Sequence, residues 1–177
     1  AGATRQETSR PSLTTLSEFQ NDAGPSGGPA KLDAPRRDGK TLRVKILVPY
    51  KRVADPDNAN KVKVPASGAS IDTAGLEWKP NPFDEYALEA ALRLTENATQ
   101  PMKRAGEVTV VTFGPKDCEL TLRAALGTGA DKAIRVDADD AALDGFVVAR
   151  ALKALVDKEK PDLVLMGKQA VDGDAGQ

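Results

Sequence analysis

The chain has 177 residues, enough for one ordinary domain of roughly 100–200 residues, and no apolar run reaches the roughly 18 residues of a membrane-spanning helix. Its 25 Lys and Arg residues nearly balance 26 Asp and Glu residues, which disfavours a nucleic acid partner because no basic excess attracts phosphate. One cysteine and no histidine exclude an intrachain disulfide, a cysteine-rich zinc site and histidine-dependent catalysis, so a cofactor or partner must supply any chemistry.

Residues 1–40 are rich in Ser, Thr, Gly and Pro and nearly free of β-branched apolar residues. Such a segment cannot bury enough surface to offset its ordering entropy, so we predict an extended, low-complexity arm that another protein chain orders. Leu13, Leu16 and Phe19 have the spacing of a short helical face for that contact, with a chance contact as the alternative. The arginines and hydroxyl residues also resemble the remains of a transit peptide, although two glutamates weaken that interpretation.

A folded domain is predicted over 41–177, beginning where the composition changes. "LRVKILVPY" is a β-branched apolar run bounded by charge, which predicts a strand over 42–48 that is buried on both faces. Between 51 and 80, short alternating apolar pieces are separated by turn residues. They predict a hairpin or another excursion from the domain.

The strongest local signal is the helix start in "NPFDEYALEAALRLTE". Asn81 is a good N-cap, Pro82 suits the first helical position, and the acidic residues that follow favour the positive end of the helix dipole. The apolar face of this helix is predicted to contain Phe83, Ala87, Ala90 and Leu94.

The rest of the chain alternates strands and helices. "EVTVVTFG" predicts a strand over 107–113 and "KDCELTLRAALGTGA" a helix from 116 to about 127–129. "KAIRVD" predicts a strand, "LDGFVVARALKALVDKEK" a helix and "PDLVLMG" a strand. This alternation is typical of right-handed βαβ crossovers around a parallel sheet. We therefore predict an α/β fold with a doubly wound, Rossmann-like parallel sheet of the kind that binds adenine nucleotides.

Four segments are predicted to lie beyond the carboxyl ends of the strands, where ligands bind in open parallel sheets. They are 49–52, 81–84, 113–115 and 167–170. Free amides at a helix start suit a phosphate group, and glycines allow close backbone approach. Each segment also has a plain structural interpretation as a solvated basic pair, a helix cap, a turn or a glycine after a strand. The phosphate-loop and dinucleotide glycine motifs are missing, so only the shared location favours a ligand site.

Four stretches in chain order, "ILVPYKRV", "NPFDEYALEAALRL", "VTFGPKDCELTLRAALGTGADKAIRV" and "KEKPDLVLMGKQAVDGDAGQ", resemble the beta subunit of electron transfer flavoprotein. The resemblance spans nearly all of 42–177, and a small nucleotide-binding protein of the stress-protein type is not expected to carry this combination. It implies a nucleotide-binding α/β fold, an alpha subunit partner that carries FAD, and a buried AMP with a structural purpose. It also implies electron transfer from dehydrogenases to the respiratory chain, in the mitochondrial matrix, on the matrix face of a membrane complex, or in the bacterial cytoplasm.

The resemblance further implies which residues bind the nucleotide. They are Pro49, Asn81, Pro82, Phe83, Asp84, Phe113, Gly167, Lys168, Gln169, Ala170, Val171, Asp172, Asp174 and Gln177. The segment after Arg52 would lie near the flavin of the alpha subunit, but Pro56 stands where the family commonly has a tyrosine, so a ring that could flank the flavin is missing there. Gly173 and Gly176 stand where acidic and amide residues are usual, which implies the loss of some phosphate ligands.

Two functions remain open at this point, and no catalytic residue is identified for either of them. If the chain is part of a longer beta subunit, its function is electron transfer through FAD, which the partner holds or shares. If the gene product ends near Gln177, the domain is a non-catalytic accessory structural subunit of a larger mitochondrial complex. An intact mass near 18.7 kDa would favour the accessory subunit, and a larger mass would favour the carrier.

Overall fold

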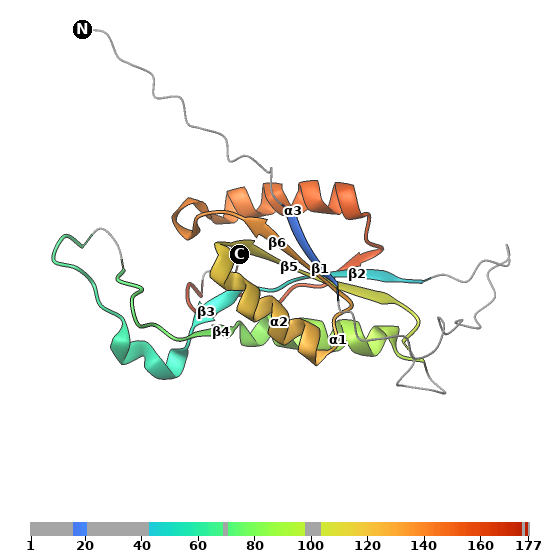
Figure 1. The fold of residues 1–177 in the computed structure, drawn as a ribbon, viewed down its shortest axis with the longest axis horizontal. Helices are drawn as coiled ribbons and strands as arrows, with labels where there is room; N and C mark the ends of the chain where they lie inside the picture. Colours follow the sequence, from blue (N-terminus) through green and yellow to red (C-terminus); the bar gives the residue numbers. More distant parts are fainter. Residues whose placement is uncertain (1–15, 21–42, 69–70, 98–103, 175, 177) are drawn as a thin grey trace, which may run out of the picture.

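The computed structural model describes residues 16–20, 43–68, 71–97, 104–174 and 176 of the chain (Figure 1). Its main feature is a five-stranded sheet with the strand order β1-β6-β5-β2-β7. The strands are β1 (Leu16–Gln20), β2 (Lys45–Pro49), β5 (Glu107–Gly114), β6 (Lys132–Asp137) and β7 (Leu163–Val164). Neighbours among β6, β5, β2 and β7 are parallel, whereas β1 runs antiparallel to β6. The predicted α/β class is confirmed.

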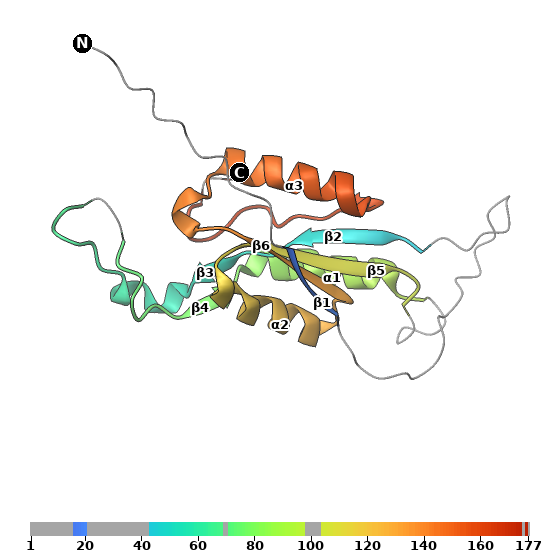
Figure 2. The same ribbon diagram turned by 45° about the horizontal axis from the view of Figure 1, so that its top comes forward.

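Helices cover both faces of this sheet. They are α1 (Pro82–Thr95), α2 (Glu119–Thr128) and α3 (Gly145–Glu159), with the short 3-10 helices η2 (Lys116–Cys118) before α2 and η3 (Asp140–Ala142) before α3. Figure 2 shows α1 and α2 on one face and α3 on the other. The described part of the domain therefore has three layers, as a doubly wound fold requires.

The order of the strands creates a switch point beside β2. The chain proceeds from β2 to β5 and then to β6, and α3 carries it back to β7 on the other side of β2. The crossovers on the two sides of this point lie on opposite faces of the sheet (Figure 2). In open α/β sheets the ligand crevice forms at such a point, outside the carboxyl ends of the strands.

Alternating side chains of β2 enter two separate cores. Ile46 and Val48 belong to the larger cluster beneath α1 and α2, whereas Leu47 belongs to the smaller cluster beneath α3. This alternation follows from the two-residue period of a strand. All three side chains are at most 1% exposed, which confirms that this strand is buried on both faces.

The face that α1 buries differs from the predicted one. Ala87 is buried as predicted, but Ala90 is exposed and Leu94 is 63% exposed. The residues that α1 buries are Asp84, Ala87, Leu88, Ala91, Leu92 and Thr95. The predicted and the observed sets both have helical spacing, so periodicity could not choose between them. The packing of Leu88 and Leu92 against the strands decides the face.

The helical face predicted around Leu16 and Phe19 is wrong. Residues 16–20 form the strand β1, in which Leu16 lies opposite Val136 of β6 and Gln20 lies opposite Lys132. Backbone pairing within the same chain, not a helical contact, gives these residues their structure. The other residues of the predicted 1–40 arm lie outside the described part of the chain, so its ordering by another protein stays a prediction.

The predicted excursion between 51 and 80 is confirmed. The strands β3 (Arg52–Ala54) and β4 (Trp78–Pro80) pair antiparallel at its base, and the 3-10 helix η1 (Pro56–Lys61) follows β3. A single bridge joins Lys63 to Asp72 further out. The excursion projects from the three-layered body in Figures 1 and 2.

Candidate functional site

A cavity of about 270 Å³ lies at the carboxyl ends of β2 and β5, beside the switch point. Three parts of the chain bound it: the strand ends at 49–51 and 111–113, the beginning of α3, and the described residues of the loop after β7, at 166–174 and 176. Among the described residues this arrangement matches the place where α/β folds bind ligands. The volume is close to the lower end of the range of about 300–1,000 Å³ found for small-molecule sites.

The walls of the cavity are mainly apolar. Val111 and Phe113 of β5 contribute one part, and Val148 and Leu152 of α3 contribute another. Met166 adds a flexible thioether side chain from the loop after β7. Such walls suit a flat apolar or aromatic group, because they remove it from water without requiring hydrogen bonds.

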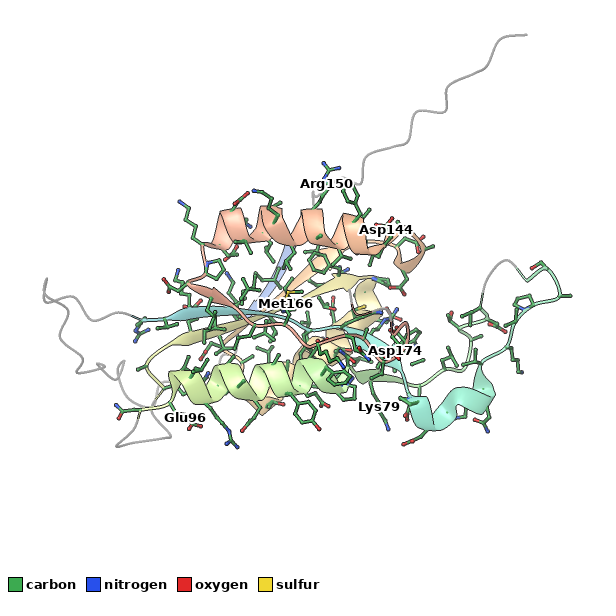
Figure 3. All side chains as sticks on the ribbon, turned by 180° about the vertical axis from the view of Figure 1, so that it is seen from behind. Lys79, Glu96, Asp144, Arg150, Met166 and Asp174 are labelled. Atoms are coloured by element: carbon green, nitrogen blue, oxygen red, sulfur yellow. The ribbon has the colours of Figure 1, made fainter. Side chains whose placement is uncertain are left out.

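Asp144 begins α3 at the rim of the cavity. Its carboxylate accepts a hydrogen bond from the backbone N–H of Val147 at 2.7 Å and so caps the helix. Figure 3 shows Asp144 and Asp174 at the same end of the molecule, whereas Arg150 lies on the outer side of α3. The helix therefore presents a negative charge, and not only free amides, toward this end of the sheet.

Lys51 and Asp172 form an ion pair at the rim. The Lys51 ammonium donates to both carboxylate oxygens of Asp172, with Nζ–O distances of 2.8 and 2.9 Å. Both residues line the cavity. The pair joins the end of β2 to the loop after β7, so it ties two of the three boundaries of the cavity together.

Asn81 holds the loop after β7 in place. Its side-chain amide donates to the carbonyl of Gln169 at 2.9 Å, and its side-chain oxygen accepts from the N–H of Val171 at 3.2 Å. The residue is only 1% exposed. Asn81 occupies the N-cap position of α1, as predicted, but its side chain makes no capping hydrogen bond. The Asn81 side chain therefore binds the loop backbone instead of capping α1.

Asp84 fixes the same loop from the first turn of α1. Its carboxylate accepts the backbone N–H of Lys51 at 2.8 Å, and a Cβ added at Gly167 would overlap the other carboxylate oxygen. That Cβ would also lie 2.7 Å from the carbonyl carbon of Phe83. Burial raises the pKa of the Asp84 carboxyl, while hydrogen bonds from Lys51, Asn81 and Gly167 act in the opposite direction. Only glycine at 167 allows this close approach.

Tyr50 lies between the cavity and the core beneath α1. Burial, together with the negative charges of Glu85 and Asp84, raises the pKa of its phenol well above the usual value. The phenol therefore keeps its proton at neutral pH and can act as a hydrogen-bond donor.

The structure divides the residues predicted to bind the nucleotide into two groups. Those that line the cavity are Pro49, Phe113, Ala170, Asp172 and Asp174. Those that lie outside its lining are Asn81, Pro82, Phe83, Asp84, Gly167, Lys168, Gln169 and Val171. Gln177 lies outside the described residues. Within the second group Asn81 and Asp84 shape the loop instead of facing the cavity. Binding of a ligand by either group stays a prediction.

Sequence reasoning missed the contribution of α3 to the cavity. Leu143, Asp144, Gly145, Val148 and Leu152 all line it. The sequence did carry a signal, because an aspartate before an apolar helical run is a typical N-cap. What it could not show is that this helix returns to the far side of β2 and so brings its start beside the ends of β2 and β5.

A second polar cluster lies at the base of the excursion. Arg52 donates to Asp117 and to Asp140 at 2.6 Å each, and its guanidinium carbon lies 4.2 Å from the centre of the Trp78 ring. Burial by itself would lower the pKa of Arg52, but the two carboxylates raise it, so the residue stays charged. Trp78 of β4 pairs with Ala54 of β3 across the two strands.

A mostly parallel sheet covered by helices on both faces, with a small cavity at its switch point, defines a doubly wound α/β domain. Residues 69–177 match the family model described as "Electron transfer flavoprotein domain". The chain therefore belongs to the electron transfer flavoprotein domain family, and the family resemblance expected from the sequence is confirmed.

Curated relatives agree with this assignment. The chain is 44% identical over 136 residues to "Electron transfer flavoprotein subunit beta" of Dictyostelium discoideum, an alignment that covers 77% of the chain and 51% of the relative. It is 42% identical over 137 residues to the protein of the same name in Homo sapiens, covering 76% and 51%. It is 41% identical over 134 residues to "Electron transfer flavoprotein subunit beta, mitochondrial" of Arabidopsis thaliana, covering 76% and 50%. The chain thus spans about half the length of these relatives.

None of the helices in the described residues is long and apolar enough to span a membrane. In the same residues, no group of three or more His, Cys, Asp or Glu side chains is placed to hold a metal ion.

Proposed function

We propose that residues 41–177 form the nucleotide-binding domain of an electron transfer flavoprotein beta subunit and that the cavity binds AMP. The observation that carries the proposal is the position of the cavity, where the ends of β2 and β5, the start of α3 and the loop after β7 meet. Most of these boundaries fall in the part of the chain that matches the family model.

The described residues fit the size and chemistry of one nucleotide. Val111, Phe113 and Leu152 would hold the base between β5 and α3, because their side chains offer an apolar wall. The loop at 170–174 would face the polar part of the ligand. A bound AMP would fill the space beneath α3 and so support the fold, which is a structural role and not a redox one.

The names of the relatives support a proposal about the wider role of the protein. We infer pairing with an alpha subunit that carries FAD and transfer of electrons from dehydrogenases to the respiratory chain, in the mitochondrial matrix or in the bacterial cytoplasm. The flavin supplies the electron chemistry when it is bound, and this chain contributes positioning. The relatives' names support this carrier role over that of an accessory structural subunit.

Binding of AMP to the 177-residue chain tests the first part. Calorimetry should detect it, and AMP at 100 times its Kd should stabilise the chain by about 2.7 kcal/mol, or about 5–10 °C in Tm. Val148→Trp should abolish binding because the indole fills the cavity from α3. The matched control Ala149→Trp places the same ring on an exposed position and should bind normally. Equal binding by the two variants would mean that the nucleotide sits elsewhere.

Reconstitution tests the second part. The chain, extended to its natural length where the gene encodes more, should form a complex with the alpha subunit of the same organism that retains flavin absorbance and reduces with a dehydrogenase and its substrate. A stable complex without flavin would instead support the accessory structural role.

A further inference from the structure

The excursion between 51 and 80 is held together at its base by its own polar contacts. The buried carboxylate of Asp55 pairs with the Lys79 ammonium at 2.7 Å and accepts the side-chain amide of Asn58 at 3.0 Å. The backbone N–H of Asp55 donates to the carbonyl of Glu77 at 2.9 Å. These contacts, together with the pairing of β3 with β4, tie the base of the excursion into one body.

Arg52 links this body to two other segments. Its guanidinium donates to Asp117 of η2 and to Asp140 of η3, at 2.6 Å each, and its side chain is only 7% exposed. Within the part of the chain that the structure describes, no other ion pair joins the excursion to η2 or η3. One buried cation therefore connects the excursion to the segments that precede α2 and α3.

The Arg52 guanidinium cannot lose a partner without a large cost. Its Nε atom is buried and has no hydrogen-bond partner among the described residues, and an unpaired charged donor away from water is strongly unfavourable. Asp117 and Asp140 are more than half exposed, so water can replace Arg52 as their partner. A shift of η3 away from β3 would therefore penalise Arg52 more than Asp140, which favours joint movement of the two segments.

Only one of the two carboxylates leads to the cavity. Asp140 begins η3, in which its carbonyl accepts the N–H of Leu143 at 3.2 Å. Leu143 and the next two residues, Asp144 and Gly145, line the cavity. Asp117 belongs to η2, and no described residue of η2 or α2 lines the cavity. The path from Arg52 to the cavity therefore runs through Asp140.

We propose that Arg52 and Asp140 couple the excursion to the start of α3, so that a ligand that fixes α3 at the cavity also fixes the position of the excursion. Arg52 is a positioning residue here, since it does not line the cavity. The coupling is reciprocal, so a partner that binds the excursion would change the affinity of the cavity for its ligand. This inference rests on the proposed binding of a nucleotide at the cavity and adds a way in which that binding is regulated.

Hydrogen exchange of the 177-residue chain without ligand tests the coupling. In Asp140→Asn the amide of Val147, which donates to Asp144 at the start of α3, should exchange at least about fivefold faster than in wild type. Asp117→Asn makes the same charge change on the other partner of Arg52, at the same 2.6 Å and with similar exposure, and should leave the Val147 amide unchanged. Equal exchange of Val147 in the two variants would overturn the inference.

A double-mutant cycle tests whether the two residues act together. Arg52→Met keeps an unbranched stem but removes the charge, so the amides of both Asp55 and Val147 should exchange faster than in wild type. Adding Asp140→Asn should then have no further effect on Val147, because both changes remove the same contact. Fully additive effects would show that Arg52 and Asp140 act separately and would overturn the inference.

Trp78 reports the effect of the ligand. It is the only tryptophan of the chain, and its ring centre lies 4.2 Å from the Arg52 guanidinium carbon. Titration with AMP should change its emission with the Kd that calorimetry gives, in wild type and in Asp117→Asn but not in Asp140→Asn. Binding of AMP to wild type without a change in emission would overturn the inference and leave the proposed function standing. Absence of AMP binding would overturn the proposed function, and the exchange of Val147 would then decide the coupling alone.

Discussion

The two faces of the sheet are packed to different extents. Beneath α1 and α2, 13 buried residues form one cluster, whereas the cluster beneath α3 contains five. The helix α1 buries six of its residues, and α3 buries only Leu155, in its second half. The first half of α3 does not close onto the sheet, and the cavity lies in the space that this leaves.

Polar residues differ between the two faces in the same way. On the α1 side, Asn81 and Asp84 are buried and bind the backbone of the loop after β7 and of the β2 end. On the α3 side, Asp144 and Asp172 stand at the rim of the cavity and remain accessible. Buried residues on the α1 side thus hold the loop in place, whereas on the α3 side the same loop borders the cavity. Variants that affect one face more than the other test this division.

The largest difference in the free energy of unfolding is expected between a leucine of α1 and a leucine of α3 that face the sheet from opposite sides. Leu88→Ala in α1 removes a side chain that is 1% exposed and should lower the free energy of unfolding by about 2–5 kcal/mol. Leu152→Ala in α3 removes a partly buried side chain that already borders a cavity, so it should cost less than about half as much. Urea denaturation followed by circular dichroism measures both. Equal losses would show that the α3 face is as tightly packed as the other.

A somewhat smaller effect is expected for the residue that holds the loop. Asn81→Ala removes hydrogen bonds to Gln169 and Val171 and leaves their backbone groups without that partner, at a cost of about 2–4 kcal/mol in total. Asn81→Asp keeps an acceptor for the Val171 N–H but has no donor for Gln169, so its loss should be intermediate.

Hydrogen exchange separates this effect from general destabilisation. In Asn81→Ala the Val171 amide should exchange faster than in wild type by more than the global loss of stability explains. If Asn81→Ala and Asn81→Asp behave alike, or if the Val171 amide keeps its protection, the side chain does not hold the loop.

The glycine at 167 should be nearly as sensitive. Gly167→Ala brings a Cβ to 2.7 Å from the Phe83 carbonyl carbon and 2.9 Å from the Asp84 nitrogen, both backbone atoms that yield little, so a loss of about 1–3 kcal/mol is expected. Gly173→Ala in the same loop meets nothing within 4 Å and should change stability by less than about 0.5 kcal/mol. Thermal unfolding of the two variants provides the comparison, and a harmless Gly167→Ala would contradict the close packing of the loop on α1.

Features that depend on local sequence patterns could be predicted, whereas features that depend on distant parts of the chain could not. The strand over 107–113, the helix start at Asn81 and the parallel crossovers follow from local periodicity and capping, and they are confirmed. The role of the Asn81 side chain depends on a loop that lies 88 positions away in the chain, so no local pattern shows it. For the same reason the sequence predicts a helix near Leu16, where pairing with the distant β6 makes a strand.

The part of the cavity that α3 contributes could likewise not be predicted from local sequence patterns. The carboxyl ends of β2 and β5 follow from the strand assignments, and Pro49 and Phe113 line the cavity as the shared location suggested. The start of α3 joins them only because β7 pairs with β2 and not with β6. Strand order is a tertiary property, since several orders bury the same apolar residues equally well.

The smallest expected effect concerns the buried carboxylate of the packed face. Burial raises the pKa of Asp84 in the folded chain above its unfolded value of about 3.9, so the folded chain binds the proton of this carboxyl more tightly than the unfolded chain does. The stability that this gives is complete below the unfolded pKa and is lost as the pH rises through the folded pKa. The free energy of unfolding of wild type, relative to Asp84→Asn, should therefore fall as the pH rises from about 4 and become constant above the raised pKa.

Urea denaturation of both proteins between pH 4 and pH 8 measures this difference, and using the difference cancels the titration of all other groups. Asp157→Asn, an equal change in formal charge on the exposed part of α3, should show no comparable fall. A difference that rises with pH would mean that the N–H donors from Lys51 and Gly167 outweigh burial at Asp84. The Asp84 carboxylate would then stabilise the loop as an anion, and ionised carboxylates would act on both faces of the sheet.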